Sequence, residues 1–354
     1  MTFEEHIVRY EDDKEIFYLA AGPSQGPLII FLHGWPAIAK TWKVQLQTFA
    51  SLGFRVVAPD LPGYGRSTAR KVQSDYAQEK ILTGLLALLA DTGRDKAVWV
   101  GHDWGCGPVW TLANTRPDVC QAVAGLAVPY GVLEYGLDEA VKHVDRKRYP
   151  EDEYPWGQWG YQAFYEQSFD KANEWFESDI AGFLKVCYIR ASPDHLDKPA
   201  VTANVVKDNG WFGGAPKPPS ANQIPDGLNS VDSELMGELV AAYEKTGFYP
   251  ADAWYMNHKA NNEYNTKNAH DGKKVDVPVL FIEAKWDNVC DTVHTTLTEP
   301  MRKFCSNLTY VSVDAGHWVA LESPSEVNAA LTKWLVERVK DWWPSQALPT
   351  PSKI

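Results

Sequence analysis

The sequence has few cysteines and no long apolar run. Its five cysteines are an odd number, and no two form a Cys-x-x-Cys pair, which argues against a disulfide framework and a zinc site. No stretch is long and apolar enough to span a membrane. The acidic residues 1–6 lack the apolar segment of a signal peptide. We therefore expect a cytoplasmic protein that is not inserted into a membrane.

Positive charge is also scarce. The chain has 34 Lys and Arg residues against 46 Asp and Glu residues, so its formal net charge is -12. This balance disfavours nucleic acids and anionic membrane surfaces as partners because both carry negative charge. The last three residues, Ser352-Lys353-Ile354, differ by one residue from the peroxisomal address Ser-Lys-Leu. The peroxisome is therefore the second expected location, after the cytoplasm.

One stretch, residues 97–107, combines a strand, a sharp turn and the start of a helix. An apolar run ends at Gly101, and Asp103 stands between Gly101 and Gly105. This is the Gly-x-nucleophile-x-Gly elbow, with aspartate where serine is usual. The glycines let strand and helix approach closely, and a helix N-terminus favours an ionised carboxylate. Helix capping alone would not need glycine on both sides, so we predict that Asp103 is a nucleophile.

Strand-like and helix-like segments alternate as far as residue 128. Predicted strands cover residues 7–10, 15–20, 28–32, 55–58, 97–100 and 119–128, and predicted helices cover residues 40–51 and 75–92, with a further helix after the elbow. Alternation of this kind is typical of an α/β protein. It predicts a mostly parallel sheet with helices on both faces.

The alternation stops at residue 129 and resumes near residue 277. Residues 129–268 are rich in aromatic, proline and polar residues, and they predict a helical lid with a loop at 208–227. Beyond them we expect strands at 279–283 and 308–313 and helices at 291–304 and 325–339. Residues 1–128 and 269–354 would then form the core of the fold.

Two polar loops follow the last two predicted strands. Asp287 lies in the first loop and His317, in an Ala-Gly-His sequence, lies in the second. The order Asp103, Asp287, His317 is the nucleophile, acid, histidine order of the α/β-hydrolase fold. Asp291 and Glu134 compete with Asp287 for the role of the acid, but Asp287 is nearer its strand end than Asp291, and Glu134 already lies within the predicted lid.

Two further motifs contain residues that could take part in catalysis. His33-Gly34-Trp35-Pro36 follows a strand end, and we expect the backbone N–H groups of Trp35 and Trp104 to bind an oxyanion, while His33 holds the turn. Gly22-Pro23-Ser24-Gln25-Gly26 matches a serine elbow, but a strand follows it where an elbow requires a helix. With no serine at the true elbow, serine esterase activity is disfavoured.

These motifs together resemble an epoxide hydrolase of the α/β-hydrolase superfamily, of the soluble type with two lid tyrosines. The resemblance covers nearly the whole chain, including Gly160 to Tyr165, Gly247-Phe248 and Trp254-Tyr255 in the predicted lid. It implies that Tyr161 and Tyr255 hold the epoxide oxygen. Cys106 departs from the family pattern, which usually has glycine at this position.

The resemblance and the residues together predict hydrolysis of a small apolar epoxide to a vicinal diol, in a detoxifying role. Asp103 would form an alkyl ester, and His317, oriented by Asp287, would activate the water that hydrolyses it. No metal or organic cofactor is needed, and both a monomer and a homodimer are compatible with the sequence. Two alternatives stay open: a haloalkane or haloacid dehalogenase with the same nucleophile, and a non-catalytic ligand-binding protein on this fold.

Overall fold

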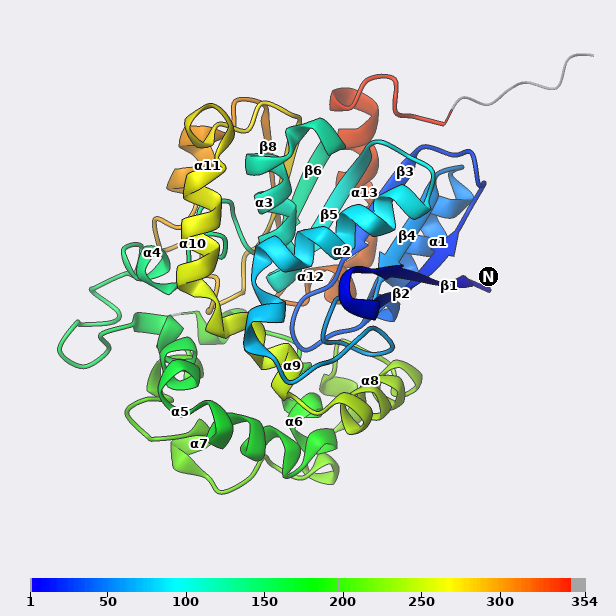
Figure 1. Ribbon diagram of the computed structural model, residues 1–354. Coiled ribbons are helices and arrows are strands. Elements are labelled where there is room, and N and C mark those ends of the chain that lie inside the picture. Colours follow the sequence, from blue (N-terminus) through cyan, green and yellow to red (C-terminus); the bar gives the residue numbers. More distant parts are fainter. Residues whose placement is uncertain (1, 197, 345–354) are drawn as a thin grey trace, which may run out of the picture.

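An eight-stranded sheet forms the centre of the computed structural model, which describes residues 2–196 and 198–344 (Figure 1). The strand order is β1-β2-β4-β3-β5-β6-β7-β8. The first two strands, β1 (Glu4–Tyr10) and β2 (Lys14–Ala21), pair antiparallel with each other, and β2 also pairs antiparallel with β4. The remaining neighbours are parallel, which confirms the predicted α/β fold with a mostly parallel sheet.

The central strands are buried on both faces, as parallel strands usually are. They are β3 (Leu28–Leu32), β4 (Arg55–Pro59), β5 (Ala97–His102), β6 (Cys120–Leu126) and β7 (Val279–Ala284). The last strand, β8 (Leu308–Val313), forms an edge of the sheet and is mostly only partly buried. Successive side chains alternate between two hydrophobic cores. In β3, Ile30 and Leu32 belong to one core while Ile29 and Phe31 belong to the other. The strands are continuous apolar runs in the sequence because both faces of the sheet pack against a hydrophobic core.

Helices cover both faces of the sheet (Figure 1). On one face, α3 (Cys106–Thr115) packs on β5 and β6, and α2 (Gln78–Asp91) packs on β1 and β2. On the other face, α1 (Lys43–Ser51) packs on β2 and β4, and α13 (Pro324–Arg338) packs on β7 and β8. The short helix α12 (Val319–Glu322) leads into α13. This arrangement places the carboxyl ends of β5, β7 and β8 at the same edge of the sheet.

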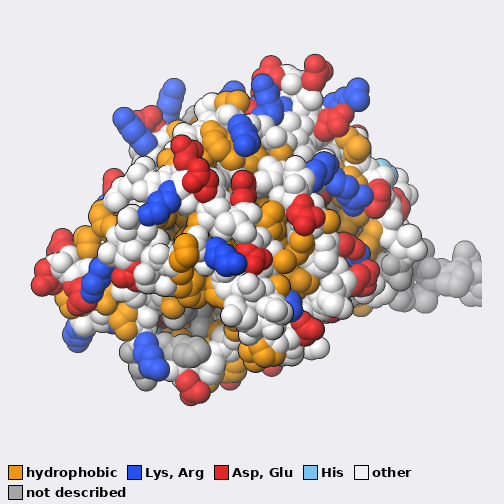
Figure 2. Space-filling model, turned by 90° about the horizontal axis from the view of Figure 1, so that it is seen from below, with side chains coloured by type: hydrophobic (Ala, Val, Ile, Leu, Met, Phe, Trp, Pro, Cys, Tyr) orange, Lys and Arg blue, Asp and Glu red, His pale blue; other side chains and the backbone are white. Residues whose placement is uncertain are grey.

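The chain between β6 and β7 forms a group of helices beside the sheet, drawn from green to yellow in Figure 1. They are α4 (Leu137–Val141), α5 (Gly160–Glu177), α6 (Ile180–Cys187), α7 (Trp211–Gly214), α8 (Ser233–Thr246), α9 (Tyr249–Asp252) and α10 (His258–Lys267). In its described part, strand-like pairing is limited to two isolated bridges, one between Ile189 and Asn229 and one that joins Val275 to Cys305 beyond β7. Figure 2 shows acidic and basic side chains interspersed on this side of the molecule. The exact limits of the lid, 129 and 268, stay a prediction.

The prediction of a helix over residues 291–304 was wrong. Only α11 (Glu299–Phe304) is helical, with Pro300 at its start. The Asp291 carboxylate accepts hydrogen bonds from the N–H groups of Val293 and His294, which holds the preceding residues in a turn. Local bonds of this kind compete with helix formation. Elsewhere the predicted loop at 208–227 contains only α7 and two short turns of 3₁₀ helix.

None of the helices in the described ranges is long and apolar enough to cross a lipid bilayer. The C-terminal Ser352-Lys353-Ile354, on which the expectation of a peroxisomal location is based, lies outside the described residues.

The contact between α3 and β6 leads to a stability prediction. A Cβ atom on Gly125 of β6 would lie 2.1 Å from Cζ2 of the buried Trp110 in α3. We expect Gly125→Ala to lower the free energy of unfolding by about 1–3 kcal/mol because the helix must move away from the sheet. Urea denaturation followed by fluorescence measures this change.

The matched control is Gly237→Ala in α8, where a Cβ would meet no atom within 4 Å. Removing a helical glycine at this open position should raise the free energy of unfolding by roughly 0.5–1 kcal/mol. Equal stability of Gly125→Ala and the natural protein would contradict the tight packing of α3 on β6.

Candidate active site

Asp103 stands at the sharp turn that joins β5 to α3. Its φ is +51°, a left-handed backbone angle that is uncommon outside glycine. A Cβ on Gly105 would lie 2.2 Å from the carbonyl oxygen of Leu32, and a Cβ on Gly101 would lie 2.5 Å from that of Gly105. Both glycines of the motif are therefore required by close backbone contacts, which leave Asp103 at the apex of the turn.

The loop after β3 contacts the Asp103 carboxylate. The backbone N–H of Trp35 donates to Asp103 Oδ1 at 2.7 Å. A Cβ on Gly34 would lie 2.3 Å from the same oxygen, so this position must be glycine for the carboxylate to approach. The ring of Trp104 is buried, with its centroid 4.8 Å from that of Tyr255. The role of the Trp104 N–H as a second oxyanion donor stays a prediction.

His317 lies between two carboxylates. Its Nδ1 is 2.6 Å from Asp287 Oδ2, and its Nε2 is 3.4 Å from Asp103 Oδ2. The other oxygen of Asp287 accepts hydrogen bonds from the backbone N–H groups of Val289 and Cys290, at 2.9 and 3.0 Å. The structure therefore brings the three residues Asp103, His317 and Asp287 together, in the order expected of nucleophile, base and orienting acid.

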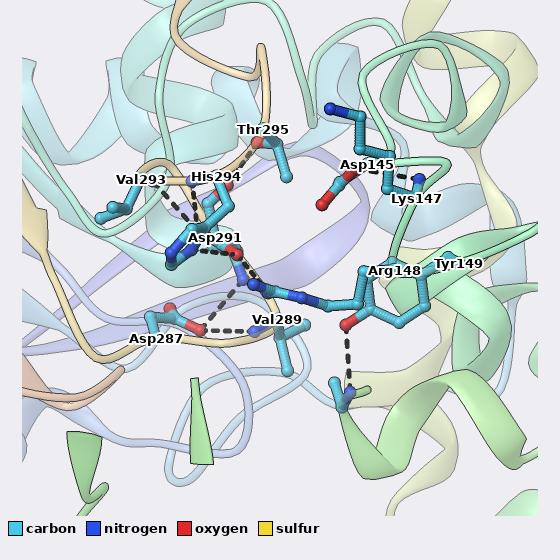
Figure 3. Close-up of polar contacts among 12 residues, drawn as sticks. Asp145, Lys147, Arg148, Tyr149, Asp287, Val289, Asp291, Val293, His294 and Thr295 are labelled. Atoms are coloured by element: carbon cyan, nitrogen blue, oxygen red, sulfur yellow. Dashed lines mark hydrogen bonds and ion pairs between the residues drawn. The ribbon is translucent and has the colours of Figure 1, made fainter. Parts of the chain in front are cut away.

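The two competing acids have other partners. Asp291 forms a buried ion pair with Arg148, at 2.8 Å, and also contacts the His294 ring (Figure 3). Glu134 accepts a hydrogen bond from the backbone N–H of Gly131. Among the residues described, Asp287 is the carboxylate that bonds to Nδ1 of His317. The geometry thus favours Asp287 over both alternatives.

A cavity of about 470 Å³ opens above these residues. Asp103 and His317 line it together with Tyr161 of α5 and Tyr255, which lies in the short 3₁₀ helix Ala253–Met256. The two tyrosine rings meet edge to face with their centroids 5.6 Å apart. The cavity wall is mostly apolar, with Trp286, Val289 and Trp318 from the core loops and Phe183, Val186 and Trp211 from the lid. A small apolar molecule fits this lining.

Charge and burial set the protonation of the site. Burial alone would lower the pKa of His317, but the carboxylates of Asp287 and Asp103 outweigh it and raise that pKa well above its usual value. Burial also opposes ionisation of Asp287, yet His317 and the two backbone N–H groups bring its pKa below its usual value. Both neighbouring carboxyl groups therefore favour the imidazolium form of His317.

The other histidines and the tyrosines near the site are neutral. Burial lowers the pKa of both His33 and His102 to about 4. The ring nitrogens of His33 contact the Gly34 carbonyl and the Leu61 N–H, which agrees with the structural role expected for this residue. Burial raises the pKa of Tyr161 and Tyr255 well above 10, so both hydroxyls remain protonated and able to donate.

Sequence reasoning missed three side chains that support the site. Gln162 Nε2 donates to the Tyr161 hydroxyl at 3.0 Å, and the buried Asp252 accepts from the Trp35 indole N–H at 2.7 Å. Cys290 lines the cavity three residues after the acid. Proximity to Tyr161 and Asp287 in the sequence was the available signal for Gln162 and Cys290. Asp252 had none, because its partner is more than two hundred residues away.

Comparisons with known proteins agree with this geometry. A family model described as alpha/beta hydrolase fold matches residues 27–161. The chain is 30% identical over 325 residues to epoxide hydrolase A of Mycobacterium tuberculosis, covering 89% of this chain and 92% of that protein. The chain belongs to the epoxide hydrolase family. This confirms the resemblance and the α/β-hydrolase fold predicted from the motifs.

A further relative and a solved structure that resemble this chain are also epoxide hydrolases. It is 29% identical over 312 residues to bifunctional epoxide hydrolase 2 of Sus scrofa, and spans about half (51%) of that longer protein. The crystal structure of epoxide hydrolase A from Mycobacterium thermoresistibile superposes with a TM-score of 0.76 at 28% identity, covering 95% of this chain and 99% of the other. The likeness thus includes the lid as well as the sheet.

The position of His317 leads to a prediction about its protonation. We expect Asp103→Asn to lower the pKa of His317 because the variant removes one of the two negative charges that favour the imidazolium. The pH dependence of the His317 ring resonances, followed by NMR, measures this shift.

The control is Asp291→Asn, which removes a buried carboxylate that does not bond to His317. The pKa of His317 should then stay at its natural value. If Asp103→Asn left the pKa unchanged, the charge of Asp103 would not be what holds the proton on His317.

Proposed function

We propose that this protein hydrolyses epoxides to vicinal diols through an alkyl ester on Asp103. The observation that carries the proposal is the cavity, where a carboxylate and a histidine face two protonated tyrosines. A carboxylate can attack a ring carbon, and a tyrosine can supply the proton that the opening ring requires. The names of the relatives support the same reaction class.

In the first step, an oxygen of Asp103 bonds to a ring carbon and the carbon–oxygen bond of the epoxide breaks. The alkoxide that forms is a much stronger base than a phenolate, whose conjugate acid has a pKa of about 10. Tyr161 or Tyr255 therefore donates its proton to the ring oxygen. The amide of Gln162 donates to the Tyr161 oxygen, which leaves the hydroxyl proton free to point at the substrate.

In the second step, water attacks the carbonyl carbon of the ester. Esterification removes the negative charge of Asp103, so His317 loses one of the two charges that hold its proton and becomes able to act as a base. His317 takes a proton from water, and the Trp35 N–H is placed to stabilise the oxyanion. The proton that His317 releases after esterification replaces the one that the tyrosine gave, so the imidazole is neutral when it takes a proton from water. The second proton of that water goes to the alcohol oxygen as the ester bond breaks. The diol leaves, and Asp103 returns as carboxylate beside a protonated His317.

A dehalogenase would use the same ester but release a halide, which accepts hydrogen bonds and needs no proton. Indole N–H groups are suitable donors for a halide. The Trp35 indole N–H is already bonded to Asp252, and two tyrosines line the cavity together with the nucleophile. These contacts favour an epoxide over a halide.

The two steps can be separated with His317→Gln. We expect the variant to react with an epoxide once and then stop, because alkylation does not need the histidine but ester hydrolysis does. Intact-protein mass spectrometry should show an increase equal to the mass of one substrate. A folded variant whose mass stays unchanged after exposure to an epoxide that the natural protein hydrolyses would remove His317 from the second step.

The lid tyrosines decide how the ring opens. Either Tyr161→Phe or Tyr255→Phe should slow alkylation, since a positioned acid contributes on the order of 10²–10⁴ in rate, and the double variant should nearly abolish it. Stopped-flow fluorescence in the His317→Gln background measures alkylation directly. Tyr165→Phe is the matched control, because this buried tyrosine packs on the Tyr255 ring at 4.9 Å between centroids and its hydroxyl has no hydrogen-bond partner among the described residues.

A panel of terminal epoxides and haloalkanes tests the reaction class itself. Diol from epoxides is the expected product. Halide from a haloalkane, with no diol from any epoxide and with the double tyrosine variant as fast as the natural protein, would make the protein a dehalogenase. Neither product from any compound would favour the ligand-binding alternative.

A further inference from the structure

A cysteine lies beside the catalytic histidine and its acid. Donor atoms of Asp287, Cys290 and His317 all lie within 4.8 Å of one another. Cys290 is buried, at 4% exposure, and it lines the cavity that also contains His317. Carboxylate, thiolate and imidazole are the three kinds of side chain that bind zinc. We propose that Asp287, Cys290 and His317 form a binding site for a thiophilic divalent cation such as Zn²⁺.

The distances suit such an ion after a small adjustment. Tetrahedral zinc with bonds of about 2.0–2.3 Å keeps its donor atoms roughly 3.3–3.8 Å apart. The widest pair of donor atoms therefore closes by up to about 1 Å around the ion, while Asp287 Oδ2 and His317 Nδ1, now 2.6 Å apart, separate by about 1 Å. Rotation of the Cys290 and His317 side chains can supply both changes. One oxygen of Asp287 is already held by the N–H groups of Val289 and Cys290, so the other, now bonded to His317, is left for the metal.

The charge of the site also favours a dication. The carboxylates of Asp287 and Asp103 both face His317. An ion coordinated by Cys290 and by Nδ1 of His317 displaces the thiol proton and the Nδ1 proton, which leave to solvent, and no electrons are transferred. The fourth position faces the cavity and takes a water molecule. Mg²⁺ and Ca²⁺ are not expected to bind, because they prefer oxygen ligands.

The bound ion would switch the enzyme off. Nδ1 of His317 and the Oδ2 of Asp287 would both be used by the metal, so the imidazole could no longer be oriented by Asp287 for attack on the ester. This inhibition rests on the proposed function, whereas the metal binding does not. The spacing of the three ligands along the chain matches no zinc motif, because they come from two separate loops.

Cobalt(II) tests the binding without any assay of activity. Titration of the natural protein with Co²⁺ should produce a thiolate-to-cobalt charge-transfer band in the near ultraviolet, and Zn²⁺ should remove it by displacement. Loss of an outer-shell partner alone costs about 10–100-fold in affinity, so Cys290→Ala should weaken binding by at least about 100-fold and abolish the band. Cys187→Ala is the matched control, because Cys187 lines the same cavity and the band should remain.

A second experiment measures the rate of epoxide hydrolysis with Zn²⁺ and compares it, for each variant, with the rate of the same variant without metal. Zn²⁺ should inhibit the natural protein and Cys187→Ala, a chelator should restore both, and Cys290→Ala should need at least about 100-fold more Zn²⁺. Thermal unfolding verifies that the variants are folded, and Cys290→Ser replaces Cys290→Ala if the latter is not.

Either of two results of the cobalt titration would overturn the site: no charge-transfer band in the natural protein, or a band that persists without Cys290. Equal inhibition of the natural protein and the Cys290 variant would also overturn it. A normal band in a protein that hydrolyses no epoxide would instead support the metal site and contradict the proposed function, so the two failures can be told apart.

Discussion

Two carboxylates buried against one imidazole are the interaction on which the site depends. Asp287 and Asp103 approach opposite nitrogens of His317, at 2.6 and 3.4 Å. A buried pair of like charges would be unfavourable alone, and the imidazolium between them offsets the repulsion. The same arrangement makes the charge of the nucleophile control the basicity of the histidine. A change in the charge of Asp103 therefore alters the pKa of His317 without any movement of the backbone.

The backbone around this charge cluster is determined by small residues. The left-handed angle of Asp103 and the short contacts at Gly34, Gly101 and Gly105 hold the nucleophile against the end of β3. Strain of this kind persists only where the surrounding structure over-determines it. Here the surroundings are the central parallel strands, which are buried on both faces. The sheet thus positions the nucleophile, and the segment between β6 and β7 supplies Tyr161 and Tyr255 to the same cavity.

Much of the architecture could be predicted because its signals are local. Alternating strands and helices, the elbow glycines and the position of Asp287 and His317 after strand ends are all visible within a few residues. Tyr161 and Tyr255 could be proposed only through the family resemblance, since a tyrosine in an aromatic-rich segment has many possible roles.

Contacts between distant residues left no such signal. The bonds of Asp252 to Trp35 and of Arg148 to Asp291 join parts of the chain that share no pattern in the sequence. The wrong helix prediction at 291–304 has the same origin. Apolar spacing there is compatible with a helix, but the Asp291 side chain binds the backbone and Arg148 instead, and the chain turns.

The ion pair of Arg148 with Asp291 and the bond of Asp252 to Trp35 have a consequence for recombination between relatives. Each joins a residue between β6 and β7 to a residue of the sheet domain, and each buries a carboxylate. A chimaera that received its lid from another protein would leave the Asp291 carboxylate and the Trp35 indole N–H buried without these partners, which is destabilising. Lid and sheet domain are therefore matched to each other, and successful exchange requires that both partners of each pair be carried across or replaced together.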